Sequence, residues 1–282
     1  MGGAPVLNTE DYVDAAIRVV APNGTPELEM ATRVRGRGNS TWGLPKKPYR
    51  LRLESSASVA GMPADRDWAL LAHYVDPTLV RTRLAMDLGD DLGVVYTPRS
   101  EFVELFFNGV YQGVYELYEH VEVAAHKIDV TQLDPDVDAA PDVITGGYHL
   151  EVDDYLDEDV CWGTTTNVPI CSKDPELDPA AVADPAHPSA AQYAYITNYI
   201  NQAEAAIFTP GNSYADFFDV DAMVDWYLVS ELVRNPDSRV LSLDTDGATS
   251  SVHMHKDRGG KLVFGPLWDF DQSAGGLDPT GW

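Results

Sequence analysis

NPDS at residues 235–238 and WDFD at residues 268–271 enclose the stretch of this 282-residue chain that decides its fold. Between them lie an apolar run with two histidines (251–255), a charged turn with two glycines (256–260) and a second short apolar run (261–264). This pattern predicts a loop with one acid, then a two-stranded hairpin, then a strand end with two more acids. Asn-Pro-Asp is also good turn chemistry, so ordinary turn aspartates are the alternative.

Protein kinases place one functional acid on a loop and a second just beyond a hairpin. The first accepts the proton of the substrate hydroxyl, and the second holds the magnesium ion of the nucleotide. Asp237 and Asp269 occupy these two positions here. Only sequence features elsewhere in the chain can distinguish this interpretation from the turn alternative.

The composition is that of an acidic globular protein. The chain has 45 Asp and Glu against 19 Lys and Arg, a formal net charge of −26, and 44% of its residues are hydrophobic. Such a charge argues against binding nucleic acid through phosphate groups, and it favours basic partners. No run reaches the roughly 18 apolar residues of a membrane span. We therefore expect a monomer without a membrane span that does not bind nucleic acid.

The two cysteines, Cys161 and Cys171, enclose a loop with a glycine, three threonines and a proline. A disulfide that closes this loop would indicate an oxidising compartment, and two isolated buried thiols are the other interpretation. Residues 1–5 lack a basic-then-apolar signal pattern. The protein is therefore either cytosolic or has had a signal removed. The acidic composition and the bridge interpretation favour a secreted or cell-surface protein.

Strand and helix signals predict an α+β protein with two lobes. Strands are expected at residues 15–20, 32–37, 49–53, 101–107, 113–118 and 148–152, with a hairpin turn at Asn108-Gly109. Helices are expected at residues 79–92, 190–207 and 221–234, and a loop at 174–188. Asp76 or Thr78 would cap the first helix, whose leucines (79, 84, 88 and 92) lie close to helical spacing. In the last helix, Met223, Tyr227 and Val233 are the expected inward residues.

Several segments allow both a structural and a functional interpretation. The glycine-rich residues 35–40 could be a tight turn, or their N–H groups and arginines could cover phosphates. They form neither a Walker A loop nor a dinucleotide fingerprint. Lys46 and Lys47 could be a solvated pair or could hold phosphates. The acids at 116, 119 and 122 could form a polar hinge or a solvated face, and His253 and His255 favour a structural role.

Six blocks of sequence, in this order, resemble the spore-coat CotH protein kinase family, an atypical group with a protein-kinase-like fold. The blocks are RGRGNSTW with KKPYRLRL (35–53), DWALLAHYVDPTLVRTRLA (67–85), FFNGVYQGVYELYEHVEV (106–123), GGYHLEVDDYLDED (146–159) with KDP (173–175), NPDS (235–238), and KDRGGKLVFGPLWDFDQSAGG (256–276). The resemblance implies an N-lobe at residues 1–118 and a C-lobe at 119–282. The family usually continues into further helices, so a truncated or minimal domain is expected.

The resemblance also implies site residues. Asp237 matches the catalytic acid and Asp269 the metal-binding acid, with Asp271 as a further metal group. The residues matched to nucleotide binding are Arg37, Asn39, Lys47, Glu119 and Lys173, and Glu151 lies in a matching block. Ser242 fits the second metal ligand by distance from Asp237, and Ser251 fits by its place before the strand, because residues 243–250 resemble an insertion.

These roles imply an atypical kinase that transfers the γ-phosphoryl group of ATP to a Ser or Thr hydroxyl, with Mg²⁺ or Mn²⁺. The acidic composition favours a basic protein or peptide as acceptor. Two alternatives are a catalytically silent nucleotide-binding or surface module with the same fold, and an enzyme that transfers AMP instead.

Overall fold

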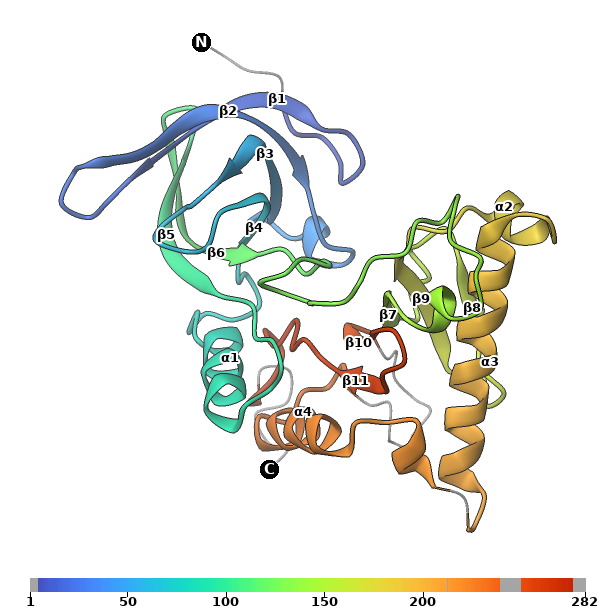
Figure 1. Ribbon diagram of the computed structural model, residues 1–282. Helices are drawn as coiled ribbons and strands as arrows, with labels where there is room; N and C mark the ends of the chain where they lie inside the picture. The colour runs from blue at the N-terminus through green and yellow to red at the C-terminus, as the bar shows by residue number, and fades with distance from the viewer. Residues whose placement is uncertain (1–4, 212, 239–249, 276–282) are drawn as a thin grey trace. The chain divides into compact units, whose positions relative to one another are not determined.

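The computed structural model describes residues 5–211, 213–238 and 250–275 (Figure 1). The chain divides into two compact units, Met1–Arg83 with Pro98–His120, and Leu84–Thr97 with Val121–Trp282. Each unit contains its own antiparallel sheet, and four α-helices lie among the described residues. The mixed α+β class is thereby confirmed. The assignment of kinase lobes at residues 1–118 and 119–282 stays a prediction.

The first unit is built on a six-stranded sheet with the order β1-β2-β3-β4-β6-β5. Its strands are β1 (Val13–Val20), β2 (Pro26–Gly36), β3 (Tyr49–Ala57), β4 (Asp65–Leu71), β5 (Ser100–Phe107) and β6 (Val110–Glu119). The hairpin predicted at Asn108-Gly109 joins β5 to β6, and both turn residues have positive φ, 49° and 80°. Asn and Gly tolerate that conformation, which fits the twist of the two strands.

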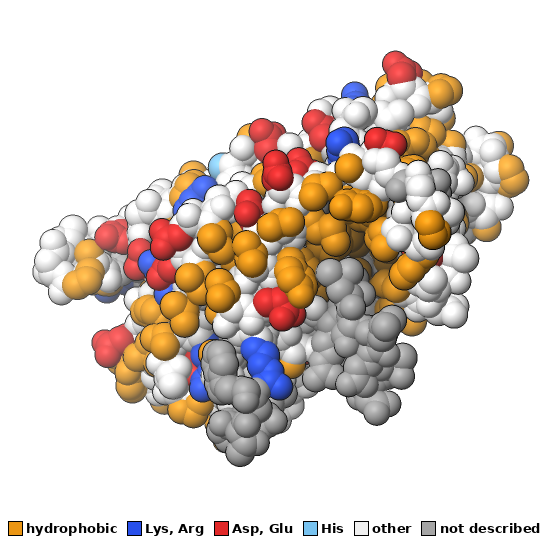
Figure 2. All heavy atoms as spheres, turned by 90° about the horizontal axis from the view of Figure 1, so that it is seen from below, with side chains coloured by type: hydrophobic (Ala, Val, Ile, Leu, Met, Phe, Trp, Pro, Cys, Tyr) orange, Lys and Arg blue, Asp and Glu red, His pale blue; other side chains and the backbone are white. Residues whose placement is uncertain are grey.

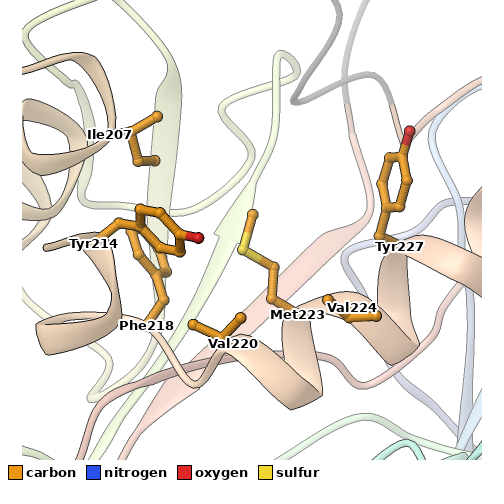
Figure 3. A pocket seen from close by; sticks show the side chains of 7 residues that line it. All are labelled: Ile207, Tyr214, Phe218, Val220, Met223, Val224 and Tyr227. Carbon is orange, nitrogen blue, oxygen red and sulfur yellow. The ribbon is translucent and has the colours of Figure 1, made fainter. Parts of the chain in front are cut away.

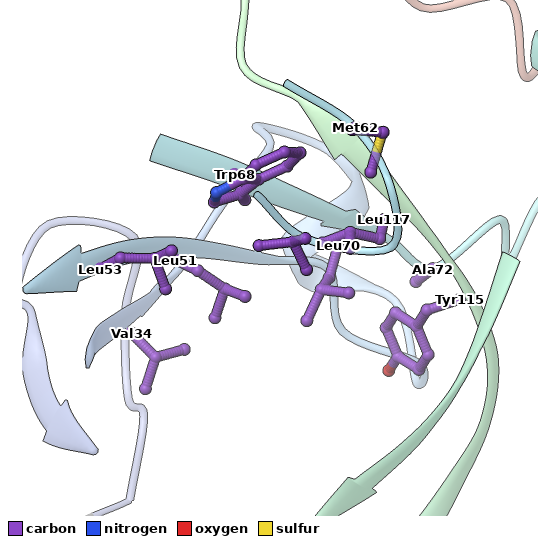
Figure 4. Close-up of a cluster of buried hydrophobic side chains, with 10 residues drawn as sticks. Val34, Leu51, Leu53, Met62, Trp68, Leu70, Ala72, Tyr115 and Leu117 are labelled. Carbon is purple, nitrogen blue, oxygen red and sulfur yellow. The ribbon is translucent and has the colours of Figure 1, made fainter. Parts of the chain in front are cut away.

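One face of this sheet forms the core of the first unit (Figure 4). Side chains alternate along the strands, so that every second residue points into the core. The fully buried members include Trp68 on β4, Leu53 on β3 and Tyr115 on β6. The opposite face of β2 and β3 therefore carries the polar residues of the same alternation.

The second unit is built on a five-stranded sheet with the order β11-β10-β7-β9-β8. The strands are β7 (Tyr148–Val152), β8 (Cys161–Gly163), β9 (Pro169–Asp174), β10 (Val252–Lys256) and β11 (Leu262–Phe264), and the helices are α2 (Pro179–Ala183), α3 (Pro188–Phe208) and α4 (Val220–Leu232). The predicted hairpin after residue 251 is confirmed as β10 and β11. The loop predicted at 174–188 is wrong in part, because Asp178 caps the short helix α2 there.

Helix α3 packs along the second sheet. The ring of Tyr195 stacks on Tyr148 of β7 at 6.1 Å between centroids, and the ammonium group of Lys256 lies 4.6 Å from the ring centroid of Tyr199. Lys256 is almost fully buried, and burial lowers its pKa to about 8. Side chains of the second sheet and of α3 thus pack against each other in the interior of the second unit.

The cysteines form a disulfide between the neighbouring strands β8 and β9, where Cys161 lies opposite Cys171. The disulfide interpretation is therefore confirmed, and the alternative of two isolated thiols is wrong. Within the described residues, no helix is both long and apolar enough to cross a membrane.

The helix predicted at residues 79–92 is confirmed, with a later start. Helix α1 (Arg81–Leu92) begins two residues late, where the Asp76 carboxylate accepts the Arg81 backbone N–H at 3.0 Å. Leu84 and Leu92 are exposed. The buried residues of this helix are Thr82, Ala85, Met86 and Gly89. A Cβ at Gly89 would lie 2.5 Å from the Leu267 side chain, so glycine allows the close packing there.

The inward face predicted for the last helix is also partly wrong. Trp226 and Val229 of α4 are buried together with the predicted Val233, whereas Tyr227 is exposed. Tyr227 and Met223 line an apolar pocket of about 320 Å³ (Figure 3). Figure 2, viewed from below, shows apolar side chains gathered on the side where α4 lies in Figure 1. Because α4 is apolar on more than one side, its periodicity does not define an inner face.

Candidate functional site

The glycine-rich segment after β2 is held tightly by its neighbours. A Cβ at Gly36 would lie 2.6 Å from the Trp42 ring, and one at Gly38, whose φ is +79°, would lie 2.0 Å from the Thr41 hydroxyl. The Arg37 backbone N–H donates to the Pro48 carbonyl at 3.3 Å. Glycine is therefore required at both positions by close approach. Arg37 is half-buried, and Asn39, at the tip of the segment, is exposed.

Lys46 and Lys47 have different surroundings. Lys46 donates to the backbone carbonyl of Ala72 at 2.7 Å and to that of Val114, and burial lowers its pKa. Lys47 donates to the carbonyl of Trp42, and its ammonium group lies 5.1 Å from the Trp42 ring centroid. Lys46 therefore fastens the sheet, and Lys47 lies beside the glycine-rich segment. A solvated pair, the structural interpretation of these lysines, is wrong.

Replacing Lys46 with Met is expected to destabilise the protein by about 1–3 kcal/mol, because two buried carbonyls lose their donor. The matched change Lys47→Met keeps those two hydrogen bonds and is expected to cost less. Urea unfolding of both variants measures the difference. Equal losses in the two variants would show that Lys46 has no special place in the sheet.

The acids at the end of β6 are buried, so the interpretation as a solvated acidic face is wrong for Glu116 and Glu119. The Glu119 carboxylate accepts the backbone N–H of Arg99 at 2.9 Å and its guanidinium at 2.7 Å. The Glu116 carboxylate lies 2.6 Å from Nε2 of His73. Both carboxylates are thus held in place by the first unit, and the predicted contact of Glu119 with a nucleotide stays a prediction.

In the second unit, α4 leads directly to the loop that carries Asp237. Arg234 has a φ of +50°, and the Asn235 backbone N–H donates to the Ser230 carbonyl at 2.9 Å, which ends the helix. The Asn235 side chain is buried, and its oxygen accepts the Asp237 backbone N–H at 3.2 Å. Asn235 therefore sets the turn, and Asp237 stands half-buried at its end.

The WDFD segment is anchored by its apolar residue. Phe270 is 1% exposed, and its carbonyl accepts the Ser273 hydroxyl at 2.7 Å. Asp269 has a φ of +55°, a left-handed conformation that Asp tolerates better than most residues. Asp271 is 8% exposed. The backbone thus turns sharply at the acid that is matched to metal binding.

A backbone hydrogen bond joins the two acid-bearing segments. The N–H of Ala274, three residues after Asp271, donates to the carbonyl of Val233 at 2.6 Å. Val233 directly follows α4 and precedes Asp237 by four residues. The structure therefore brings together the NPDS loop and the WDFD segment, which are about thirty residues apart in sequence.

Lys173 of β9 lies among carboxylates. Its ammonium nitrogen is 3.0 Å from Oε2 of Glu151 on β7, and it also pairs with Glu158. Burial opposes the charge of Lys173, but Glu151 and Glu158 outweigh this effect and raise its pKa above the ordinary value. The two carboxylates thus hold the Lys173 ammonium group in a fixed position in the second sheet.

His253 connects this ion pair to the WDFD segment. Its Nε2 lies 3.8 Å from Oε1 of Glu151, and its ring centroid is 6.2 Å from that of Trp268. Its Nδ1 is 3.0 Å from Nε2 of His149. Burial lowers the pKa of His253 to about 4, even though Glu151 acts in the opposite direction. Both histidines are therefore neutral at neutral pH, and Lys173 is the cation of the cluster.

Asp153, the residue directly after β7, is almost fully buried. Burial, together with the nearby charges of Glu151 and Asp157, raises its pKa from 3.8 to about 7, although its carboxylate accepts the Tyr155 backbone N–H. The folded state therefore keeps a proton that the unfolded chain releases in this range. The resulting stabilisation is complete below pH 3.8 and is lost as the pH rises through about 7.

The variant Asp153→Asn stays neutral at every pH and keeps the acceptor for Tyr155. It is expected to be more stable than the wild type at pH 8, by up to about 4 kcal/mol, and to remove the decline in stability between pH 4 and 7. Urea unfolding at pH 5 and pH 8 measures both effects. A decline of the same size in the variant would assign it to another group.

The residues present fit a magnesium or manganese ion. Mg²⁺ is usually held by one or two carboxylates together with phosphate oxygens and water, and Asp269 and Asp271 are carboxylates of this kind. Among the residues described, no group of three or more His, Cys, Asp or Glu is arranged to hold a metal. Ser242 lies outside the described residues. Ser251 is half-buried, with a φ of +61°.

The structure groups the predicted residues in three places. Arg37, Asn39 and Lys47 surround the glycine-rich segment, and Glu119 lies at the end of β6 in the same unit. The remaining described residues, Lys173, Asp237, Asp269 and Asp271, belong to the second unit. The sequence did not reveal the partnership of Lys173 with Glu158. Two features of the sequence could have indicated this ion pair. Lys173 is one of only six lysines, and an acidic turn (153–159) precedes Cys161 just as Lys173 follows Cys171.

Comparison with known proteins agrees with the order of these elements. The family model described as "CotH kinase protein" matches residues 34–280. "Inner spore coat protein H" of Bacillus subtilis (strain 168) is 33% identical over 86 residues, which is 30% of this chain and 23% of that relative. The match thus spans less than a quarter of that relative's length. Since the family model covers most of the chain, including the glycine-rich segment, the NPDS loop and WDFD, the chain belongs to the CotH kinase family.

Proposed function

We propose that the protein is an ATP-dependent kinase that phosphorylates Ser or Thr hydroxyls of a basic protein or peptide. The observation that carries the proposal is the hydrogen bond from Ala274 to Val233, which joins the chain just after the WDFD segment to the chain just before the NPDS loop. Membership of the family supports the use of ATP. In this proposal the two compact units are the two lobes of a kinase fold.

Each acid has a defined part in the reaction. Asp237 orients the acceptor hydroxyl and takes its proton as the oxygen forms a bond to the γ-phosphorus. The bond from that phosphorus to the β–γ bridging oxygen breaks, and ADP leaves. Asp269 and Asp271 hold Mg²⁺ or Mn²⁺, with Ser242 as the proposed further ligand. The metal, when bound, neutralises phosphate charge.

The remaining residues position the nucleotide. Arg37, Asn39 and Lys47, with the backbone N–H groups of the glycine-rich segment, contact its phosphates. Lys173, oriented by Glu151, supplies a fixed positive charge, and Glu119 is a further nucleotide-binding residue. Since little covalent chemistry is required of the protein, positioning and charge stabilisation would supply most of the rate.

The test is the fate of labelled ATP. The protein is incubated with Mn²⁺, a Lys/Arg-rich or a neutral Ser/Thr peptide, and ATP labelled at either the α or the γ phosphate. We expect label from γ alone, with more on the basic peptide at low salt, because the chain carries a net charge of −26. Label from α alone would replace the proposal with AMP transfer. No nucleotide binding by the folded protein would leave a surface module.

A further inference from the structure

The face of β2 and β3 opposite the core carries four arginines. Arg33 lies directly opposite Arg52, and Arg35 directly opposite Arg50. The residues between them, Val34 and Leu51, point into the core, so the alternation of both strands places all four guanidinium groups on the other face. Arg33 is exposed, and the other three are half-buried. Two adjacent cross-strand pairs of like charge result.

This arrangement costs stability. Like charges directly opposite each other across two strands are destabilising. The repulsion is not due to a shortage of acidic residues, because the chain contains 45. The Asp67 carboxylate lies 3.1 Å from Nη2 of Arg50 and 2.9 Å from Nε of Arg52, and Asp14 of β1 lies opposite Arg33. Four arginines thus meet two acids in the middle of this face, and farther along the same strands the alternation adds Arg18, Glu29 and Glu54.

Tyr12 lies in the middle of the arginines. The guanidinium carbon of Arg33 is 5.2 Å from its ring centroid, and those of Arg35 and Arg52 are both 5.3 Å away. The Tyr12 hydroxyl and Nε of Arg35 are buried and have no hydrogen-bond partner within the part of the chain that the structure describes. Buried donors without an acceptor are costly. Nη1 of Arg35 donates to the Thr9 carbonyl, and a cluster of guanidinium groups of this kind favours a carboxylate or phosphate as a further acceptor.

We propose that this arginine face, formed by Arg33, Arg35, Arg50, Arg52 and Tyr12, binds an extended anionic peptide segment of a partner protein. Arginines two residues apart on a strand repeat at about 6.6–6.8 Å, which is also the repeat of alternate side chains in an extended peptide. Carboxylate or phosphate groups at every second position of the partner can therefore meet successive arginines, with the paired hydrogen bonds that guanidinium favours.

The protein's negative charge does not prevent this binding. At physiological ionic strength the screening length is about 8 Å, so a local excess of arginine dominates over distant acids. The same negative charge disfavours a long nucleic acid, whose phosphates would extend beyond the face. The proposal concerns a docking surface, and it stands independently of whether the protein transfers phosphate.

The experiment measures the anisotropy of a fluorescent peptide with Glu at alternate positions, beside a peptide of the same charge whose Glu residues are consecutive. We expect tighter binding of the alternating peptide, and at least a tenfold loss of affinity in the double variant Arg33→Gln/Arg52→Gln. Thermal unfolding checks that the variant is folded, since Asp67 keeps its ion pair with Arg50 when Arg52 is replaced. Arg18→Gln, at an exposed position of β1 that pairs weakly with Glu29, is the matched control.

Several results would overturn the proposal. One is absence of peptide binding by the wild type at low salt. A second is an equal loss in Arg18→Gln, which would indicate a general charge effect. A third is an effect of the double variant on ATP affinity alone, which would assign the face to the nucleotide. Transfer of label from ATP is measured separately, so its failure does not bear on these outcomes.

Discussion

Replacing Asp237 with Asn is expected to lower the rate of phosphoryl transfer by about 10²- to 10⁴-fold, the usual contribution of a positioned base. The turn should persist, because Asp237 contributes its backbone N–H to the bond with Asn235. Affinity for the metal–nucleotide complex should stay close to that of the wild type. Steady-state kinetics and calorimetric titration with Mn²⁺ and a non-hydrolysable ATP analogue measure the two effects.

Asp269→Asn is the matched comparison for that variant. Asn tolerates the left-handed backbone at this position, where Asp269 has a φ of +55°, so the substitution removes charge without new strain. Metal-dependent nucleotide affinity and transfer should both fall. If Asp237→Asn lost nucleotide affinity as severely as Asp269→Asn, the separate roles of base and metal ligand would be contradicted.

Replacing Lys173 with Met is expected to destabilise the protein by about 3–5 kcal/mol. The change leaves Glu151 and Glu158 without their shared cation in a largely buried cluster, and an uncompensated buried charge is costly. Urea unfolding measures the loss. Adding Glu158→Gln to the variant should recover part of it, because one of the two stranded charges is removed.

Lys261→Met, at an exposed position just before β11, is the control for the loss of a lysine. It is expected to change stability by less than about 0.5 kcal/mol. A loss of that small size in Lys173→Met as well would show that the carboxylate cluster is already neutralised by protons or water. The view of Lys173 as a fixed charge beside the WDFD segment would then be abandoned.

Local sequence patterns predicted the sheets well. Asn108-Gly109 marks a hairpin because few other residue pairs accept two consecutive positive φ angles. Alternation located β3 for a similar reason, since one buried face imposes a period of two. The strand β7 is buried along its whole length, and β4, β8 and β9 were not predicted. The helices were located, but their buried sides were not predicted. Gly89 and Leu267 meet from distant parts of the sequence, and no local pattern encodes that contact.

The sequence predicted the residues of the candidate site but not their contacts with one another. The order of the six sequence blocks matched Asp237 and Asp269 to the family. The hydrogen bond between Ala274 and Val233 depends instead on the tertiary fold of two segments that are distant in sequence. Lys46 and Lys47 are neighbours in an irregular segment without a defined side-chain period. The sequence therefore could not show that Lys46 donates hydrogen bonds to two backbone carbonyls, or that the ammonium group of Lys47 lies near the Trp42 ring.

The central claim is tested most directly by γ-labelled ATP with the wild type, Asp237→Asn and Asp269→Asn side by side. The folding of each variant is confirmed by circular dichroism and thermal unfolding. We predict transfer of γ label to a Ser/Thr peptide by the wild type and loss of transfer in both variants. Equal transfer by all three folded proteins, or none by a wild type that binds ATP and metal, would contradict the assignment of a kinase built on these two acids.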